Sequence, residues 1–322
     1  MISPAPSARA VAACLPHCDV LTPPPRKGAA RLGELLRIRA FAIPLLIVFA
    51  FLFAYPLAQS LYWSFTDFGG YSDEVSFVGL DNYAAIFTDP SMLAGLGFTI
   101  LFTLGTTVLI TVIAIPVAVV LNRAFIGRNF VRSILFFPSI PSVAILGLVW
   151  GFILSPLGSG ALNSILQGGL GLGPLPWLSD ATLAQISVIV VGVWSNAGWH
   201  AILYLAYLQS IPADLYEVAT VDGASALQKF RHITVPLLSP AVTISCLLLM
   251  TSGLKVYDLP FTLTGGGPGF STYTITQTII QNGISQAQFG RASALAVVFM
   301  LLVGAIVAVQ LVLSNRVERR NS

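Results

Sequence analysis

The stretch YEVATVDGASALQKFRHITVPLLSP, residues 216–240, is hydrophilic although it lies between two long apolar runs. At its start, Asp214 followed by Glu217 is an acidic capping-box pattern with Asp214 as the N-cap. The pattern predicts a short helix that runs to about Val221. Gly223 is the residue expected to turn freely after that helix, with a positive φ.

A second short helix is expected next. Ser225 with Gln228 repeats the capping pattern, and Leu227 and Phe230 then fall on one side of the helix. Pro236 stands where the next apolar segment begins, a position that proline tolerates well. The stretch therefore predicts a bent pair of helices at a membrane surface, which is the shape of a docking element.

The composition places the rest of the chain in a membrane. Hydrophobic residues make up 56% of the chain and charged residues 9%, and the mean hydropathy is +0.84. Three cysteines give no disulfide framework. Apolar segments near the roughly 20 residues that a bilayer requires must satisfy their own backbone groups, so they should be helices. We expect an all-α membrane protein with six transmembrane helices at about 40–62, 97–121, 133–154, 183–208, 237–256 and 292–313.

The connections between these segments differ in charge. The first and third, about 64–96 and 155–182, contain no Lys or Arg, and the fifth has only Arg291. By the positive-inside rule, both termini and the 216–240 loop are therefore predicted to be cytoplasmic. The basic residues of that side are Arg26, Lys27, Arg31, Arg37, Arg39, Arg123, Arg128, Arg132, Lys229, Arg231, Arg316, Arg319 and Arg320.

Residues 1–39 form a basic segment without apolar periodicity, and we expect it to be disordered. Cys14, His17 and Cys18 have the types of metal ligands, but no second pair accompanies them, so we expect no metal site. The six-helix membrane domain is expected over residues 40–320, with its docking loop at about 209–236.

The docking stretch also carries a resemblance to a known family. Glu217-Val218-Ala219, then a glycine, then Ile233 and Val235-Pro236 resemble the loop that permease subunits of ABC importers insert into their ATPase partner. The usual form has Ala at the position of Val218 and Leu at that of Val235. The added Asp222-Gly223-Ala224, Phe230 and the later TGGGP at 264–268 resemble the carbohydrate branch, the maltose-permease type. The resemblance covers roughly residues 40–320.

The resemblance implies a type I importer permease, a binding-protein-dependent inner membrane component in the bacterial plasma membrane, multi-pass, and not an enzyme. It implies a second permease subunit, as a heterodimer, together with two ATP-binding subunits and an extracytoplasmic solute-binding protein, and no nucleic acid. ATP and Mg would be bound by the ATP-binding subunits, and this chain would bind no cofactor. The solute would be a sugar or a related polyol. The implied ATPase-docking residues are Asp214, Glu217, Ala219, Asp222, Gly223, Ala224, Phe230 and Pro236.

The fourth apolar segment holds the densest polar and aromatic cluster: Trp194, Ser195, Asn196, Trp199 and His200. Helical spacing puts Asn196, Trp199 and His200 on one face, which should look at other helices or at a wet cavity, because unpaired polar groups are costly in hydrocarbon. Such a face can be a sugar site, with an indole stacked on the ring, or ordinary hydrogen bonding and packing between helices. Both interpretations remain open.

Lys255, Tyr257 and Asp258 lie near the outer end of the fifth segment. Lys255 either snorkels to the surface beside an acid or lines the outer part of a translocation path. The prolines Pro116, Pro138 and Pro141 predict kinks or local unwinding.

Two other kinds of protein compete with the importer permease. A membrane-embedded transferase would need a cluster of catalytic groups, and the three histidines are scattered along the chain. A self-contained transporter or channel would have no use for an ATPase-docking loop. The glycine-rich run 265–269 lacks the Gly-Lys-Ser/Thr ending of a nucleotide loop, so this chain is expected to couple to ATP hydrolysis only through a partner.

Overall fold

The computed structural model describes residues 42–71, 75–157 and 160–321. Within these ranges the chain is helical, apart from loops and one isolated antiparallel bridge between Thr66 and Phe77. The predicted disordered segment 1–39, with Cys14, His17 and Cys18, lies outside the described residues. The elements are η1 (Ala50–Ala54), α2 (Tyr55–Trp63), α3 (Asp81–Thr88), α4 (Pro90–Asn122), α5 (Arg128–Phe136), η2 (Phe137–Ser139), α6 (Val143–Ile153), α7 (Ala161–Leu170), α8 (Ala181–Leu208), α9 (Asp214–Val221), α10 (Ala226–Lys229), η3 (Phe230–Thr234), α11 (Val235–Leu237), α12 (Ser239–Leu254), α13 (Asp258–Thr264), α14 (Ile275–Ile280), η4 (Gln281–Ser285) and α15 (Phe289–Asn321).

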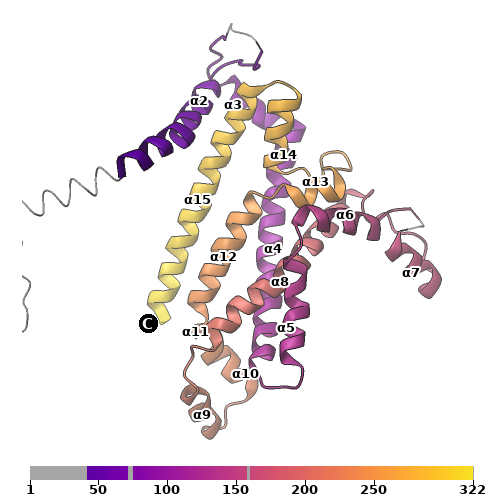
Figure 1. Cartoon of the computed structure of the whole chain (residues 1–322), viewed down its shortest axis with the longest axis vertical. Coiled ribbons are helices and arrows are strands. Elements are labelled where there is room, and N and C mark those ends of the chain that lie inside the picture. Colours follow the sequence, from indigo (N-terminus) through magenta and orange to yellow (C-terminus); the bar gives the residue numbers. More distant parts are fainter. Residues whose placement is uncertain (1–41, 72–74, 158–159, 322) are drawn as a thin grey trace, which may run out of the picture. The chain divides into compact units, whose positions relative to one another are not determined.

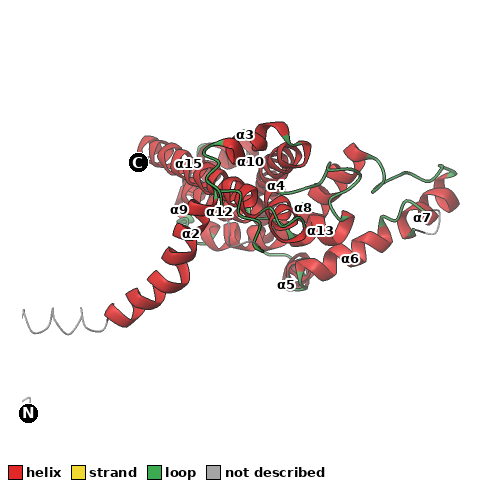
Figure 2. Cartoon of the chain, turned by 90° about the horizontal axis from the view of Figure 1, so that it is seen from above, coloured by secondary structure: helices red, strands yellow, loops and turns green. Residues whose placement is uncertain are grey.

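The chain divides into two units, Met1–Ala58 and Gln59–Ser322. The described part of the first unit belongs to one apolar helix, Ala42–Trp63, which is long and apolar enough to cross a membrane. In the second unit, α4 packs along α8, and α12 packs on α4 and α15 (Figures 1 and 2). The largest core cluster joins α4, α8 and α12 through side chains such as Ile110, Tyr204 and Leu249, all less than a tenth exposed.

All six predicted apolar segments fall on helices, and four described helices are long and apolar enough to span a bilayer on their own: Ala42–Trp63, Pro90–Asn122, Ala181–Leu208 and Phe289–Val312. The other two segments belong to bent pairs. Arg128–Ser139 meets Val143–Ile153 at 93°, and Ala226–Leu237 meets Ser239–Leu254 at 64°. By length and composition, the described chain therefore has four candidate spans, or six if each bent pair is one span.

The kink or local unwinding predicted at Pro138 and Pro141 is confirmed, and it divides the segment 133–154 into α5 and α6. The chain breaks between α5 and α6 at Pro138 and Pro141, which have no N–H for a helical hydrogen bond. α6 then packs against α13, where a Cβ on Gly147 would clash with the Thr262 side chain. At Pro116, by contrast, α4 continues as one helix from Pro90 to Asn122, so the unwinding expected there does not occur.

Threonine hydroxyl groups line the buried side of α4 without interrupting the helix. Thr99, Thr103, Thr106 and Thr111 each donate a hydrogen bond of 2.7 Å to the carbonyl four residues earlier. The Thr99 hydroxyl also accepts a hydrogen bond of 2.9 Å from the Ile275 N–H at the start of α14. α4 thus presents a surface whose polar groups are largely satisfied within the helix.

Asp89 caps the start of α4. Its carboxylate accepts hydrogen bonds from the Ser91 and Met92 N–H groups at 2.8 and 3.3 Å. Partial burial raises the pKa of Asp89, but the hydrogen bonds from Ser91 and Met92 and the nearby charge of Arg291 outweigh it and hold that pKa below its usual value. The cap is therefore in place at neutral pH.

Candidate functional site: a docking element and an exposed face of α8

The polar stretch forms two short helices at the end of the molecule where α4 and α8 end (Figure 1). We call residues 214–234, which comprise α9, α10 and η3, the docking element. A cavity of about 300 Å³ lies between it and the two long helices; its lining includes Asn122 of α4, Leu208 of α8, and Tyr216 and Phe230 of the docking element. The docking element is therefore packed onto the helices that form the core.

The structure corrects the expected start of α9. Ala213, not Asp214, is the N-cap, and no side chain caps the helix. Asp214 is already in the first turn, and both Asp214 and Glu217 are exposed. Acidic side chains in the first turn of a helix still interact favourably with the positive end of the helix dipole. The acidic pattern therefore predicted the correct helix, although the interaction is not the side-chain cap that we expected.

The bend and the second helix follow the prediction. Gly223 has φ = 75°, and the Ala224 N–H donates to the Ala219 carbonyl at 2.9 Å, which closes the end of α9. Ser225 and Gln228 form a full capping box, with bonds of 2.7 Å from the Ser225 N–H to Gln228 Oε1 and 3.3 Å from the Gln228 N–H to Ser225 Oγ.

Two side-chain bonds tie the pieces of the docking element together. Lys229 Nζ donates to Thr220 Oγ1 at 2.7 Å, and this contact joins α10 to α9. The Tyr216 hydroxyl lies 3.1 Å from Thr234 Oγ1, and this contact joins α9 to η3. The relative angle of the two short helices is therefore fixed by side chains as well as by the turn.

The eight predicted docking residues divide by exposure. Asp214, Glu217, Asp222 and Gly223 are exposed, whereas Ala219, Ala224, Phe230 and Pro236 are half-buried. The outer surface also carries apolar side chains that are not among the eight predicted docking residues: Val218 is 60% exposed, Val221 87% and Leu227 73%. An apolar patch beside an exposed carboxylate is a surface suited to a protein partner.

The second candidate site is the part of α8 that carries Trp194, Asn196 and Trp199; helical spacing puts Asn196 and Trp199 on one face and Trp194 on another side of the helix. These three side chains are exposed, and Trp194 makes an edge-on contact with Trp150 of α6, with ring centroids 5.3 Å apart. Asn196 Nδ2 donates to the Gly192 carbonyl at 2.9 Å and to Ser195 Oγ at 3.0 Å, which leaves its carbonyl oxygen for another group.

His200 is the buried member of the predicted face, and its ring lies edge-on to the ring of Trp199, with centroids 4.7 Å apart. His200 is 4% exposed, and its Nδ1 lies 2.7 Å from Ser245 Oγ of α12. The ring is turned into the interface between α8 and α12, while Asn196 and Trp199 remain outside it. Spacing along one helix could not show this division, because the position of α12 decides which part of the polar arc is covered.

The outer group lies where α12 ends. Lys255 is the exposed C-cap of α12, Asp258 begins α13 and is exposed, and Tyr257 stacks on Phe261 with centroids 5.0 Å apart. The chain thus changes direction at these three residues, as expected for the end of the fifth apolar segment.

The residue pattern did not single out Gly198. A Cβ at this position of α8 would clash with the backbone carbonyl of Leu135, so the absence of a side chain lets α5 approach α8 closely. The sequence signal that could have identified Gly198 is the preference for small residues where membrane helices contact each other. Among the described residues there is no group of three or more His, Cys, Asp or Glu side chains that could hold a metal ion.

Several apolar helices long enough to span a bilayer define the class as a polytopic membrane protein. The polar element packed at one end offers a surface suited to a partner protein. The family described as binding-protein-dependent transport system inner membrane component matches residues 110–319. The chain is 31% identical to the probable starch degradation products transport system permease protein AmyD of Thermoanaerobacterium thermosulfurigenes, over 86% of this chain and 94% of that protein. It is 32% identical to the multiple sugar-binding transport system permease protein MsmF of Streptococcus mutans, over 86% and 94%.

The fold is similar to that of a chain in the crystal structure of a bacterial alginate ABC transporter in complex with an alginate pentasaccharide-bound periplasmic protein. The TM-score is 0.77 at 22% identity, and the match covers 89% of this chain and 97% of that one. The chain belongs to the family of inner membrane components of binding-protein-dependent transport systems. It is a permease subunit of an ABC importer and a multi-pass membrane protein, as the residues of the docking stretch predicted.

Proposed function

We propose that this permease forms, with a second permease subunit, the translocation path for a sugar or a related polyol. A solute-binding protein delivers the solute from outside, and two ATP-binding subunits, which carry ATP and Mg, drive the transport. The observation that carries the sugar assignment is the exposed α8 face of Asn196 and Trp199, with Trp194 exposed on another side of the same apolar helix. Relatives named for starch degradation products, multiple sugars and arabinooligosaccharides support it.

The chemistry of this face suits an uncharged polyhydroxyl solute. The flat face of an indole packs against the C–H groups of a sugar ring, and an amide can accept and donate hydrogen bonds to hydroxyl groups. No charged residue occurs in α8, so nothing on this helix selects an ion. The residues we assign to the path are Trp194, Asn196 and Trp199, with Lys255, Tyr257 and Asp258 at its outer end.

His200 positions α8 relative to α12 and thereby maintains the geometry of the proposed path. Its bond to Ser245 joins α8 to α12 directly behind the exposed face. Because the ring is 4% exposed, it positions the helix that presents Asn196 and Trp199 and has little surface for solute.

The docking element receives an ATP-binding subunit. Its exposed Glu217 and the apolar side chains Val218, Val221 and Leu227 form the contact surface, while Tyr216 and Phe230 face the ends of α4 and α8. Such an arrangement passes a movement of the partner to α4, α8 and α12, because the element is packed on their ends.

The test is solute uptake by the importer reconstituted with its partner subunits and binding protein. Asn196→Ala and Trp199→Ala should each lower uptake, by roughly 2- to 10-fold for the loss of one hydrogen bond or one ring contact. Val190→Ala is the matched control, because Val190 is also exposed on α8 but apolar.

A pull-down of the ATP-binding subunit should give the same yield for all three variants. Normal uptake by both the Asn196 and Trp199 variants at every solute concentration would make this face structural packing. A loss of the pull-down would instead mean that the variants had disturbed assembly.

A further inference from the structure

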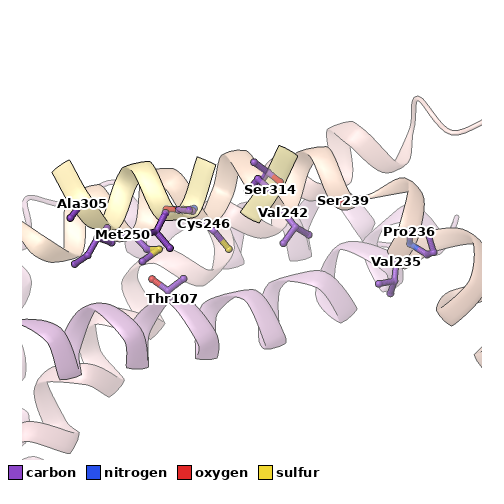
Figure 3. Close-up of a pocket in the computed structure, with 13 residues that line it drawn as sticks. Thr107, Val235, Pro236, Ser239, Val242, Cys246, Met250, Ala305 and Ser314 are labelled. Atoms are coloured by element: carbon purple, nitrogen blue, oxygen red, sulfur yellow. The ribbon is translucent and has the colours of Figure 1, made fainter. Parts of the chain in front are cut away.

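A further cavity lies outside the exposed face of α8 and adjoins the docking element only at its mouth. Its volume is about 770 Å³, and it lies between α4, α12 and α15 (Figure 3). Ser239, Val242, Cys246 and Met250 line it along one face of α12 at helical spacing, and Ala305 and Gln310 line it from α15. No residue of α8 is part of the lining.

The cavity runs along α12 from the end that carries the docking element. Val235 and Pro236, which directly follow that element, line the mouth. From Ser239 to Met250, α12 rises about 16 Å at 1.5 Å per residue. This length is about half of the ~30 Å hydrocarbon core of a bilayer, so the cavity matches the depth of one leaflet.

The cavity contains polar atoms that have no partner. Both amide atoms of Gln310, Nε2 and Oε1, are buried without a hydrogen bond, and so is Oγ1 of Thr107, whose residue is 8% exposed. A buried amide without partners is unfavourable, and the surrounding lining is mainly apolar. The occupant that completes this site is therefore mostly apolar and brings one donor and one acceptor to the level of Gln310.

Basic residues adjoin the chain segments that line the mouth. Arg231 precedes Val235 by four residues, and Arg316, Arg319 and Arg320 follow the lining residue Ser314 in the sequence of α15, with Glu318 as the one acid among them. Basic clusters next to cavities between membrane helices attract anionic headgroups on the cytoplasmic side.

We propose that this cavity binds one anionic phospholipid of the cytoplasmic leaflet, of the phosphatidylglycerol type. An acyl chain fills the apolar length as far as Met250. At the mouth, the Gln310 side chain, whose amide atoms are buried without partners in this structure, rotates so that Nε2 donates to an ester carbonyl and Oε1 accepts from a glycerol hydroxyl. The phosphate lies among the basic residues.

The position of the lipid gives it a role in coupling, and this role rests on the proposed function. Val235 and Pro236 belong to α11, which joins the docking element to α12. An occupied cavity fixes the distance between α11 and α15, and an empty one lets α11 shift toward α15. Binding itself is tested without any transport measurement, so the two proposals can fail separately.

The experiment uses the full chain, purified with the subunits that accompany it and reconstituted in phosphatidylcholine bilayers. A trace of phosphatidylglycerol or phosphatidylcholine with a photoactivatable group on the acyl chain is added, and cross-linked peptides are identified by mass spectrometry. We expect cross-links on α12 between residues 239 and 250, roughly tenfold stronger with the phosphatidylglycerol probe.

Matched variants locate the site. Ala305→Phe fills the cavity and should remove the α12 cross-link, whereas Ala308→Phe, an exposed position of α15 outside the lining, should keep it. Gln310→Leu should reduce the cross-link with a similar side-chain volume. The triple variant Arg316→Gln, Arg319→Gln and Arg320→Gln should lose the preference for the anionic probe.

Equal cross-linking by the two probes in the unaltered chain would overturn the proposal, and this comparison does not depend on any variant folding. Equal labelling of the Ala305 and Ala308 variants would also overturn it. So would the absence of any α12 cross-link, the result expected if a helix of another subunit fills the cavity.

Discussion

Gly198 sets the distance between α5 and α8 at the scale of a single residue. The obstacle to a side chain at Gly198 is the Leu135 carbonyl, a backbone atom that cannot rotate away. We expect Gly198→Ala to destabilise the chain by about 1–3 kcal/mol or more. The measurement is the temperature at which the detergent-solubilised protein loses its monodisperse state.

Gly97→Ala is the control, because a Cβ there meets no atom within 4 Å. It should be neutral or stabilising, since alanine is favoured over glycine inside a helix by about 1 kcal/mol. Equal melting of the two variants would show that α5 does not need its close approach to α8.

Gly223 is limited by backbone conformation, because no atom lies within 4 Å of the position of a Cβ and its φ is +75°. A β-branched residue in this left-handed region costs about 1–2 kcal/mol. We expect Gly223→Val to misdirect α10 and abolish solute-stimulated ATP hydrolysis in the reconstituted importer, while the membrane helices still insert.

Gly223→Asn separates conformation from identity, since asparagine adopts the left-handed region more readily. It should retain most of the stimulation. If Gly223→Val also supports stimulation at the unaltered level, the turn plays no part in coupling.

At the scale of elements, the sequence predicts which segments are helical but not how they are angled. Pro138 and Pro141 indicate a break, because they remove backbone donors, yet the 93° between α5 and α6 depends on the packing of α6 against α13, far along the chain. For the same reason, the spacing of α8 predicted its polar arc but not the burial of His200 by α12.

Local capping was predictable where one side chain decides it. Ser225 and Gln228, three residues apart, form the predicted capping box. Asp214 is not the N-cap of α9, because that helix begins one residue earlier than the pattern indicates and Ala213 takes the N-cap position. Helix starts shift easily by one residue when no side chain fixes them.

Ser225→Ala should loosen α10. The substitution removes the acceptor of the Gln228 N–H and costs about 0.5–2 kcal/mol, which corresponds to roughly 2- to 30-fold faster amide hydrogen exchange in residues 226–230. Thr220→Val is the control: it removes the partner of Lys229 but leaves the cap intact, so exchange at these amides should change less. If amide exchange in residues 226–230 increased more in Thr220→Val than in Ser225→Ala, the contact of Lys229 with Thr220, and not the cap, would stabilise α10.

At the scale of the whole molecule, the charge asymmetry predicts the orientation in the membrane. In a chain without its native cysteines, Gly173→Cys should react with an impermeant thiol reagent added outside the cell. Ile126→Cys and Val221→Cys should react only after the membrane is permeabilised, although both side chains are exposed, at 104% and 87%. Labelling of the Val221 position from outside would place the docking element on the wrong side for an ATP-binding partner.

The threonines of α4 have a consequence for biosynthesis. Since Thr99, Thr103, Thr106 and Thr111 bond to carbonyls of their own helix, α4 can leave the translocon for lipid before any later helix has been synthesised. The Thr99 oxygen then already stands as an acceptor when Ile275, 176 residues further along, emerges from the ribosome. We therefore expect the second transmembrane segment to form first and the newly made C-terminal third of the permease to pack on it.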